Sequence, residues 1–192
     1  MVEGYGDLLF YAELLETLGL YGQVFIKQFN GRGDLATKLE TFLTPELLAS
    51  KAAFGLLVDA DTNAQSTASE FSRVLLRITR QTVSHGAWTQ GPPRIGLFVT
   101  PDGTSDGEIE TLVWQAWSSD PANSGPRRCV DDFITCMRGA GFTPDSPHKG
   151  LVSALLAIRH DDDPRLGPGA RAKVFDFGRP EFLALREFLS RF

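Results

Sequence analysis

Two aspartates one residue apart close a short apolar segment in the first third of the chain. Gly55 to Val58 are small or apolar, and Asp59 and Asp61 come directly afterwards. A short apolar run of this kind is typical of a strand buried on both faces of a parallel sheet. Ligands bind beyond the carboxyl ends of such strands, and residues i and i+2 of an extended chain share one side. The pattern therefore predicts a cradle in which two carboxylates hold a hard divalent cation, Mg²⁺ or Mn²⁺.

The segments around these aspartates predict an α/β fold. Strands are expected at Met1–Val2, Val24–Phe29, Gly55–Asp59 and Arg94–Val99. Helices are expected at Leu8–Leu18, at Asp34–Phe42, from Thr44, at Asn63–Thr82 and from Asp106. This alternation predicts a mostly parallel, four-stranded sheet with helices on both faces. Residues 1–118 are expected to form that domain, and residues 119–192 a helical extension packed on it, with helices at Arg127–Arg138, Leu151–Ile158 and Pro180–Phe192.

Further acidic motifs accompany the aspartate pair. Val2-Glu3-Gly4-x-x-Asp7 stands at an expected strand-to-helix turn, and Leu57-Val58-Asp59-Ala60-Asp61 ends a later strand. In this combination the chain resembles the TOPRIM domain shared by topoisomerases, bacterial primases and the overcoming-lysogenisation-defect nucleases. More closely, it resembles a family of short stand-alone TOPRIM-like bacterial proteins of unknown function. Those also carry a Pro-Asp segment and a downstream Gly-x-x-Glu, here Pro101-Asp102 and Gly107-Glu108-Ile109-Glu110.

The resemblance covers most of the chain and implies a TOPRIM-like, Rossmann-like fold with a metal-dependent active site. It departs from the family in one respect, because only Met1 and Val2 precede Glu3 where the family has a full strand. The implied ligands of a first Mg²⁺ or Mn²⁺ are Glu3, Asp59 and Asp61, joined by Asp7. The implied ligands of a second ion are Asp102 and Glu110, with Glu108 as a less favoured competitor. TOPRIM nucleases also have a lysine that assists phosphodiester cleavage, and Lys149 is the best match.

Each of these residues also has an ordinary structural interpretation. Asp7 is suited to cap a helix, Asp102 to a turn, and Glu110 to the positive end of a helix dipole. Lys149 alone would be a solvated lysine. Glu3 is interpreted either as a ligand or as a general acid/base, which the sequence does not separate.

Three arginines form a stripe on the helix that follows the aspartates. Arg73, Arg77 and Arg80 are spaced at i, i+4 and i+7, which puts them on one helix face. Guanidinium groups match phosphate geometry, so the stripe is a candidate nucleic-acid-binding surface. The alternative is a solvated helix face.

The function implied by the resemblance is hydrolysis of a nucleic-acid phosphodiester, with DNA or RNA as substrate. A chain of 192 residues lacks the domains that a topoisomerase or primase would add. It also contains no Gly-x4-Gly-Lys-Ser/Thr loop, so ATP use would require an ATPase partner of the kind found with anti-phage systems. The net charge of −5 argues against a general DNA-coating protein. Without an apolar run of roughly 20 residues or a signal peptide, a cytoplasmic protein is expected.

Two other functions compete with the nuclease. In a haloacid-dehalogenase-type phosphatase, Asp59 would be the nucleophile and Asp61 the acid/base, with Leu97–Thr100, Lys149 and Asp161-Asp162 as later motifs. Against it, 58 residues precede the nucleophile motif, which usually opens that domain, and a plain helix follows where a hairpin flap is expected. The other alternative is a catalytically silent regulatory subunit with the TOPRIM shape.

Overall fold

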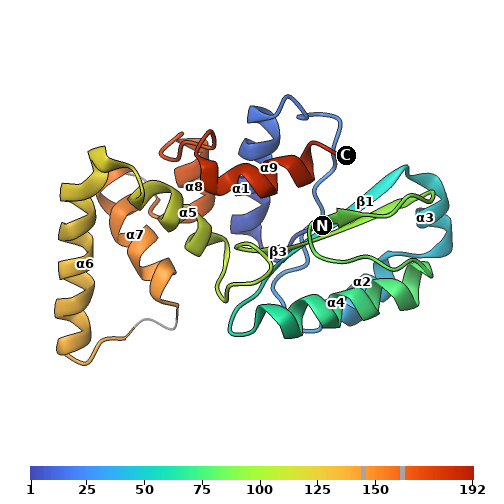
Figure 1. Cartoon of the computed structure of the whole chain (residues 1–192), viewed down its shortest axis with the longest axis horizontal. Helices are drawn as coiled ribbons and strands as arrows, with labels where there is room; N and C mark the ends of the chain where they lie inside the picture. Colours follow the sequence, from blue (N-terminus) through green and yellow to red (C-terminus); the bar gives the residue numbers. More distant parts are fainter. Residues whose placement is uncertain (144–145, 161–162) are drawn as a thin grey trace.

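A small twisted sheet lies between helices in the computed structural model, which describes residues 1–143, 146–160 and 163–192 (Figure 1). Strands β1 (Ala53–Asp59) and β3 (Arg94–Thr100) are parallel, and the short strand β2 (Ala87–Trp88) pairs with β3 in the antiparallel direction. The sheet order is β1-β3-β2. Asp59 is in register with Thr100, so both parallel strands end at the same edge of the sheet. The α/β class and the two buried strands are confirmed.

The prediction of four mostly parallel strands is wrong, because Val24–Phe29 does not form a strand. This segment contributes one parallel bridge, between Gln28 and Val2. Hydrogen bonds connect the segment to residues 1–3: Val2 donates to Lys27 at 2.9 Å and Phe29 donates to Glu3 at 3.3 Å. The residues on either side of this bridge are irregular.

Helices make up most of the remaining described chain. Their bounds are α1 (Tyr5–Thr17), α2 (Leu35–Phe42), α3 (Pro45–Ser50), α4 (Ala64–Thr79), α5 (Ile109–Ser118), α6 (Ser124–Gly139), α7 (Pro147–Arg159), α8 (Leu166–Arg171) and α9 (Leu183–Leu189), with 3₁₀ turns at Pro121–Asn123 and Pro180–Phe182. The expected helix through Thr82 ends at Thr79, because Arg80 adopts a left-handed conformation (φ 61°). Strand β2 and helix α8 have no counterpart in the sequence prediction.

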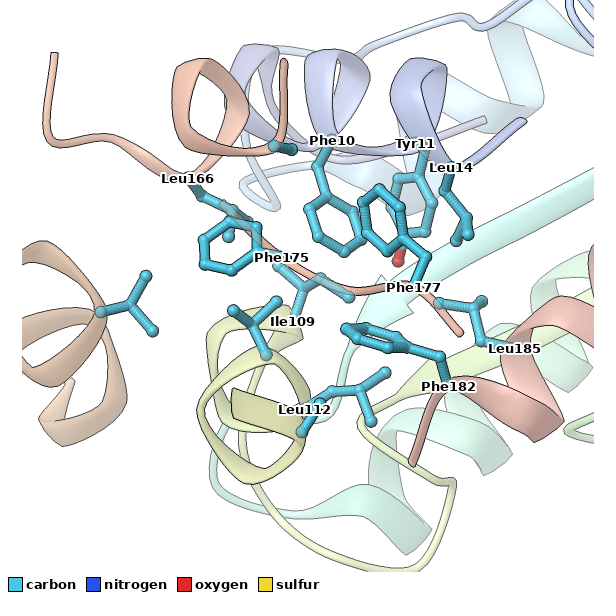
Figure 2. Close-up of a cluster of buried hydrophobic side chains, with 14 of the residues drawn as sticks. Phe10, Tyr11, Leu14, Ile109, Leu112, Leu166, Phe175, Phe177, Phe182 and Leu185 are labelled. Carbon is cyan, nitrogen blue, oxygen red and sulfur yellow. The ribbon is translucent and has the colours of Figure 1, made fainter. Parts of the chain in front are cut away.

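The sheet separates two hydrophobic cores, because successive strand residues point to opposite faces. On one face, Leu56 and Leu97 pack with residues of α2 and α4, including Leu39 and Phe71. On the other face, Leu57 and Phe98 join a larger core built from α1, α5, α7, α8 and α9. Figure 2 shows the centre of this second core, where Phe10 of α1 meets Phe177 and Phe182. Helices therefore cover both faces of the sheet, as predicted.

The last helix lies on the sheet through an aromatic contact. Trp88 of β2 stacks on Phe188, with ring centroids 4.9 Å apart, and its indole N–H donates to the Phe188 carbonyl at 3.0 Å. The indole ring covers Gly96 so closely that an added Cβ would lie 2.7 Å from it. Residues after 118 thus share a core with the sheet, while the domain division at 118 stays a prediction. None of the helices in the described ranges has the length and apolar character required to cross a bilayer.

Candidate active site

The first residues of the chain bring Glu3 to the end of β1. Residues 1–3 run beside this strand, because the Met1 carbonyl accepts a hydrogen bond from Leu57 N–H at 2.9 Å. Slightly further along, Oε1 of Glu3 accepts a hydrogen bond from the Asp59 backbone N–H at 3.0 Å. The first acidic motif and the aspartate pair are therefore in contact.

Asp59 points from the strand end toward the start of α5. Its Oδ1 atom accepts hydrogen bonds from the Thr100 hydroxyl and, at 3.0 Å, from the Ile109 backbone N–H. Burial raises the pKa of Asp59 well above its ordinary value, and the negative charges of Asp7, Glu3 and Glu110 raise it further. A carboxylate that ionises this reluctantly is in a region where negative charge is concentrated and water is largely excluded.

Three neighbouring carboxyl groups also have pKa values above their ordinary range. Burial raises the pKa of Glu3 from 4.5 to about 7 and that of Glu110 from 4.5 to about 7, and it also raises the pKa of Asp7. Asp7 raises the pKa of both glutamates through its charge. We call Glu3, Asp7, Asp59 and Glu110 the acidic cluster.

Helix starts partly offset this concentration of charge. Asp7 lies in the first turn of α1, where its Oδ2 accepts a hydrogen bond from Gly4 N–H at 2.7 Å. Glu110 lies in the first turn of α5. The N-terminus of a helix carries a partial positive charge, which favours carboxylates there. The capping interpretation of Asp7 and the dipole interpretation of Glu110 are thus both compatible with a place in the acidic cluster.

Asp61 contacts Arg32. The Arg32 guanidinium forms an ion pair with Oδ2 of Asp61, donates to the Asp59 carbonyl at 3.2 Å and donates to the Thr67 hydroxyl at 2.8 Å. Asp61 itself is left-handed (φ 52°) and bridges to Gly107 through two backbone hydrogen bonds of 2.7 and 2.8 Å. The two aspartates of the motif therefore have different hydrogen-bond partners in this structure, although the charge of Asp61 still raises the pKa of Glu3.

Asp102 is held within its own turn. Its carboxylate accepts hydrogen bonds from the backbone N–H and hydroxyl groups of Thr104 and Ser105, at 2.7 to 2.8 Å. Burial alone would raise the pKa of Asp102, but these hydrogen bonds outweigh it and lower the pKa to about 2. In the structure Asp102 is therefore a turn residue, as its structural interpretation predicted. Its charge is not among the causes that raise the pKa of any member of the acidic cluster.

Lys149 reaches the same region from α7. The helix begins at Pro147, earlier than the predicted start at Leu151, so Lys149 lies in its first turn. Its Nζ forms an ion pair with Oε2 of Glu108. Burial alone would lower the pKa of Lys149, but the hydrogen bond to Glu108 and the charges of Glu110, Glu108 and Asp59 raise it. The lysine therefore carries its positive charge beside the acidic cluster.

The arginine stripe lies on α4 and its C-terminal end. Arg73 and Arg77 line an open surface hollow of about 680 Å³ together with Glu70 and polar residues of the first turns. Arg77 forms an ion pair with Glu40 of α2. Arg80 ends the helix in a left-handed conformation. Two of the three arginines thus share one surface.

The acidic cluster fits a divalent cation in its chemistry. Within the described residues, no three His, Cys, Asp or Glu side chains are arranged as a ready-made metal site. However, Oε2 of Glu110 is buried and has no hydrogen-bond partner in the described part of the chain. Mutual repulsion also raises the pKa of the clustered carboxyls. A hard cation would relieve both costs, and carboxylate oxygens are its preferred ligands.

Comparison with known proteins places the chain in a family. The family model described as "Protein of unknown function (DUF3226)" matches residues 1–192. The chain belongs to this family. No curated protein matches the chain, and no solved structure matches it either. The family description names no activity, so the function has to be argued from the site.

Two residues of this region are not singled out by the sequence pattern. Arg32 stands in an Asn-Gly-Arg-Gly turn, a sequence that does not point to a binding site. The structure brings this turn to the sheet edge, because Gln28, four residues earlier, forms a parallel bridge with Val2. Tyr11 reads as a core residue of α1, and it is 4% exposed. Burial raises its pKa, as do the charges of Asp59, Asp7, Glu3 and Glu110, which sets the phenol beside the acidic cluster. Asp161 and Asp162 lie outside the described residues.

Proposed function

We propose that this protein is a Mg²⁺- or Mn²⁺-dependent phosphodiesterase that acts on nucleic acid, with a TOPRIM-like active site. The observation that carries this proposal is the contact between Glu3 and Asp59 at one sheet edge. Asp7 and Glu110 raise the pKa of Asp59 there through their charge. Backbone pairing of residues 1–3 with Gln28 on one side and β1 on the other also supports a TOPRIM-like arrangement.

In this proposal Glu3, Asp7, Asp59 and Glu110 would hold the cation, with Asp61 available if Arg32 releases it. When bound, the cation would polarise the phosphate and activate water. The site itself would contribute the ammonium of Lys149, which carries positive charge beside the carboxylates and would stabilise negative charge that develops on the phosphate. Glu3, with a pKa of about 7, is also suited to move a proton near neutral pH when no cation is bound to it.

Nucleic acid would approach along α4. The hollow that Arg73 and Arg77 line begins at Asn63, Gln65 and Ser66, and Asn63 is the N-cap of α4, two residues after Asp61. A phosphate backbone held by the arginines would therefore lead toward the end of β1. The ATPase partner that the TOPRIM resemblance implies is part of the proposal, and a pull-down from the native host that recovers no ATPase would count against it.

The first experiment is calorimetric titration of the full chain with MnCl₂, using wild type, Glu3→Ala, Asp59→Ala and the control Glu16→Gln on the exposed end of α1. Loss of binding in both Ala variants, with binding kept in the control, would support one shared site. Cleavage of single-stranded DNA, duplex DNA and RNA would then be measured with Mn²⁺. Loss in Asp59→Ala alone would favour the phosphatase, and no binding by wild type would favour a silent regulatory subunit.

A further inference from the structure

Glu108 is a buried acidic residue two positions before Glu110 of the acidic cluster. The residue is 7% exposed and occupies the N-cap position of α5. An N-cap side chain normally accepts a hydrogen bond from the first turn of its own helix, but the Glu108 carboxylate makes no such bond. The side chain is therefore directed to something other than α5.

Both carboxylate oxygens of Glu108 contact the first turn of α7. Oε1 accepts a hydrogen bond from the Ser146 hydroxyl, and Oε2 forms the ion pair with Lys149. Ser146 is the N-cap of α7 and accepts a hydrogen bond from Lys149 N–H at 3.3 Å. A second link runs in parallel, because the Thr111 hydroxyl lies 3.1 Å from Nδ1 of His148. The starts of α5 and α7 are thus joined by polar contacts centred on Glu108.

These contacts leave Glu108 poorly suited to bind a metal ion. Each of its oxygens already has a partner, and one partner is a cation. Two residues later, Oε2 of Glu110 is buried and has no hydrogen-bond partner among the described residues. Of the two glutamates in Glu108-Ile109-Glu110, the second is the one with an oxygen available for a ligand.

The ion pair restricts a side chain that would otherwise be mobile. The Lys149 side chain is 55% exposed, whereas that of Glu108 is 9% exposed. A lysine has a long flexible stem, and an exposed one samples many rotamers. Glu108 lies at the start of α5, where the Ile109 N–H donates to Oδ1 of Asp59 at 3.0 Å. This buried carboxylate therefore selects the lysine conformers in which the ammonium lies at the same end of α5 as Asp59 and Glu110.

We propose that Glu108 is a positioning residue that holds Lys149 at the acidic cluster and is not a metal ligand. The inference rests on the proposed function, in which Lys149 acts on the phosphate. It adds the residue that delivers this lysine from the C-terminal third of the chain to a site otherwise built by residues 3–110.

The test compares Glu108→Gln, Glu108→Asp and Ser146→Ala in the full chain, with Glu16→Gln as the matched control. The main readout is the rate at which acetic anhydride acetylates Lys149, measured by mass spectrometry relative to exposed Lys51. Removing the adjacent negative charge in Glu108→Gln should raise this relative rate about tenfold, equivalent to one pKa unit of the amine. Ser146→Ala keeps the charge and should leave the rate near that of wild type, and Glu108→Asp should fall between the two.

Manganese affinity and cleavage complete the test. Glu108→Gln should bind Mn²⁺ no more than about 10-fold more weakly than wild type, because one nearby negative charge is removed. The cleavage rate should fall roughly 10- to 100-fold, the range expected when a catalytic group is misplaced. Partial recovery of the rate in Glu108→Asp would support positioning by a carboxylate. Equal loss in Ser146→Ala would instead show that only the link between α5 and α7 matters, which would overturn the proposal.

Two further results would overturn it without reference to cleavage. One is unchanged Lys149 acetylation in Glu108→Gln, and the other is loss of Mn²⁺ binding in that variant, which would make Glu108 a ligand. If wild type binds Mn²⁺ but cleaves no nucleic acid, the proposed function fails alone, because acetylation and metal affinity still decide the part of Glu108. If Glu108→Gln does not fold, as judged by circular dichroism, Glu108→Ala supplies the same comparison, because it also removes the carboxylate.

Discussion

The Glu3 carboxylate accepts a hydrogen bond from the backbone N–H of Asp59, although the two residues are 56 positions apart in the chain. This bond does more than align two segments, because it places one acidic side chain directly against the strand end that carries another. The pKa of Glu3 is raised to about 7 through burial, while the hydrogen bond from Asp59 and the charge of Arg32 oppose that rise.

The stability of the metal-free protein should fall as the pH rises from about 5 to 8. The pKa of Glu110 is about 7 in the folded protein, against an ordinary value of 4.5. Between these values the folded chain binds a proton that the unfolded chain releases, so rising pH favours unfolding. Glu110→Gln removes this cost and should raise the Tm at pH 8 by roughly 2–8 °C, or about 1–2 kcal/mol, with little change at pH 5. Calorimetric scans at both pH values would measure it, with Glu16→Gln as control, and equal Tm shifts at both would contradict it.

Mn²⁺ should raise the Tm at pH 8, as Glu110→Gln is expected to do. A cation held by ionised carboxylates stabilises the folded state by mass action, and its binding requires those groups to lose their protons. We therefore expect a Tm increase with 1 mM MnCl₂ at pH 8 that shrinks at pH 5. A thermal shift that is independent of pH would show that the ion binds elsewhere.

Lys149→Met should separate catalysis from metal binding. The substitution keeps the apolar stem of the side chain but removes the ammonium that faces the acidic cluster. Cleavage should slow by about 10²- to 10³-fold, as when one group that stabilises transition-state charge is removed. Mn²⁺ affinity should be unchanged or tighter, since a positive charge is lost nearby. Cleavage at the wild-type rate would exclude the lysine from the reaction.

Arg32→Gln should loosen the loop that carries Arg32 while freeing Asp61. The guanidinium contacts the Asp61 carboxylate, the Asp59 carbonyl and the Thr67 hydroxyl, so its loss should destabilise the protein by about 1–3 kcal/mol. Mn²⁺ should bind roughly 3- to 10-fold more tightly, because one positive charge is removed close to the site. Calorimetry on this variant and on Arg128→Gln, an exposed arginine of α6, would measure both. Weaker Mn²⁺ binding would mean that Arg32 orients Asp61 for the metal.

Arg73→Gln should weaken nucleic-acid binding without changing metal affinity. Arg73 is exposed and lines the hollow on α4, whereas Arg77 is paired with Glu40. Loss of one phosphate contact should reduce the slope of log K against log salt concentration by about 1. Fluorescence anisotropy with a labelled oligonucleotide at several salt concentrations would test this, with Arg128→Gln as control. An unchanged slope would favour a solvated helix face.

The sequence reveals some members of this site and hides others for physical reasons. Asp59 follows a short run of apolar residues that is typical of a buried strand, so its place at the sheet edge is predictable. Glu3 and Asp7 are singled out only by the resemblance of Val2-Glu3-Gly4-x-x-Asp7 to the TOPRIM motif. Arg32 cannot be predicted, because a glycine-flanked turn has no hydrophobic periodicity. The pairing of Gln28 with Val2 places that turn at the sheet edge.

The fold shows the same contrast. Strands β1 and β3 are short, almost entirely apolar runs and are predictable as buried strands, whereas the segment 24–29 has the composition of a strand but forms a single bridge, between Gln28 and Val2. Asp102 looks equivalent to Asp59 in sequence, since both follow a buried strand. In the structure, however, the Asp102 carboxylate accepts hydrogen bonds from four donor groups of Thr104 and Ser105. A pattern of apolar residues does not predict such a local turn.

The link between Glu108 and Lys149 has a consequence for how the chain folds. The groups at the sheet edge come from residues near positions 3, 59, 110 and 149, so they meet only through contacts of large sequence separation, which form slowly. The ion pair with Glu108 forms across 41 positions of the chain, and the contact with Ser146 across 38. We therefore expect protection of Lys149 from acetylation to be among the last signals to appear during refolding, which makes this single amine a reporter of the completed native state.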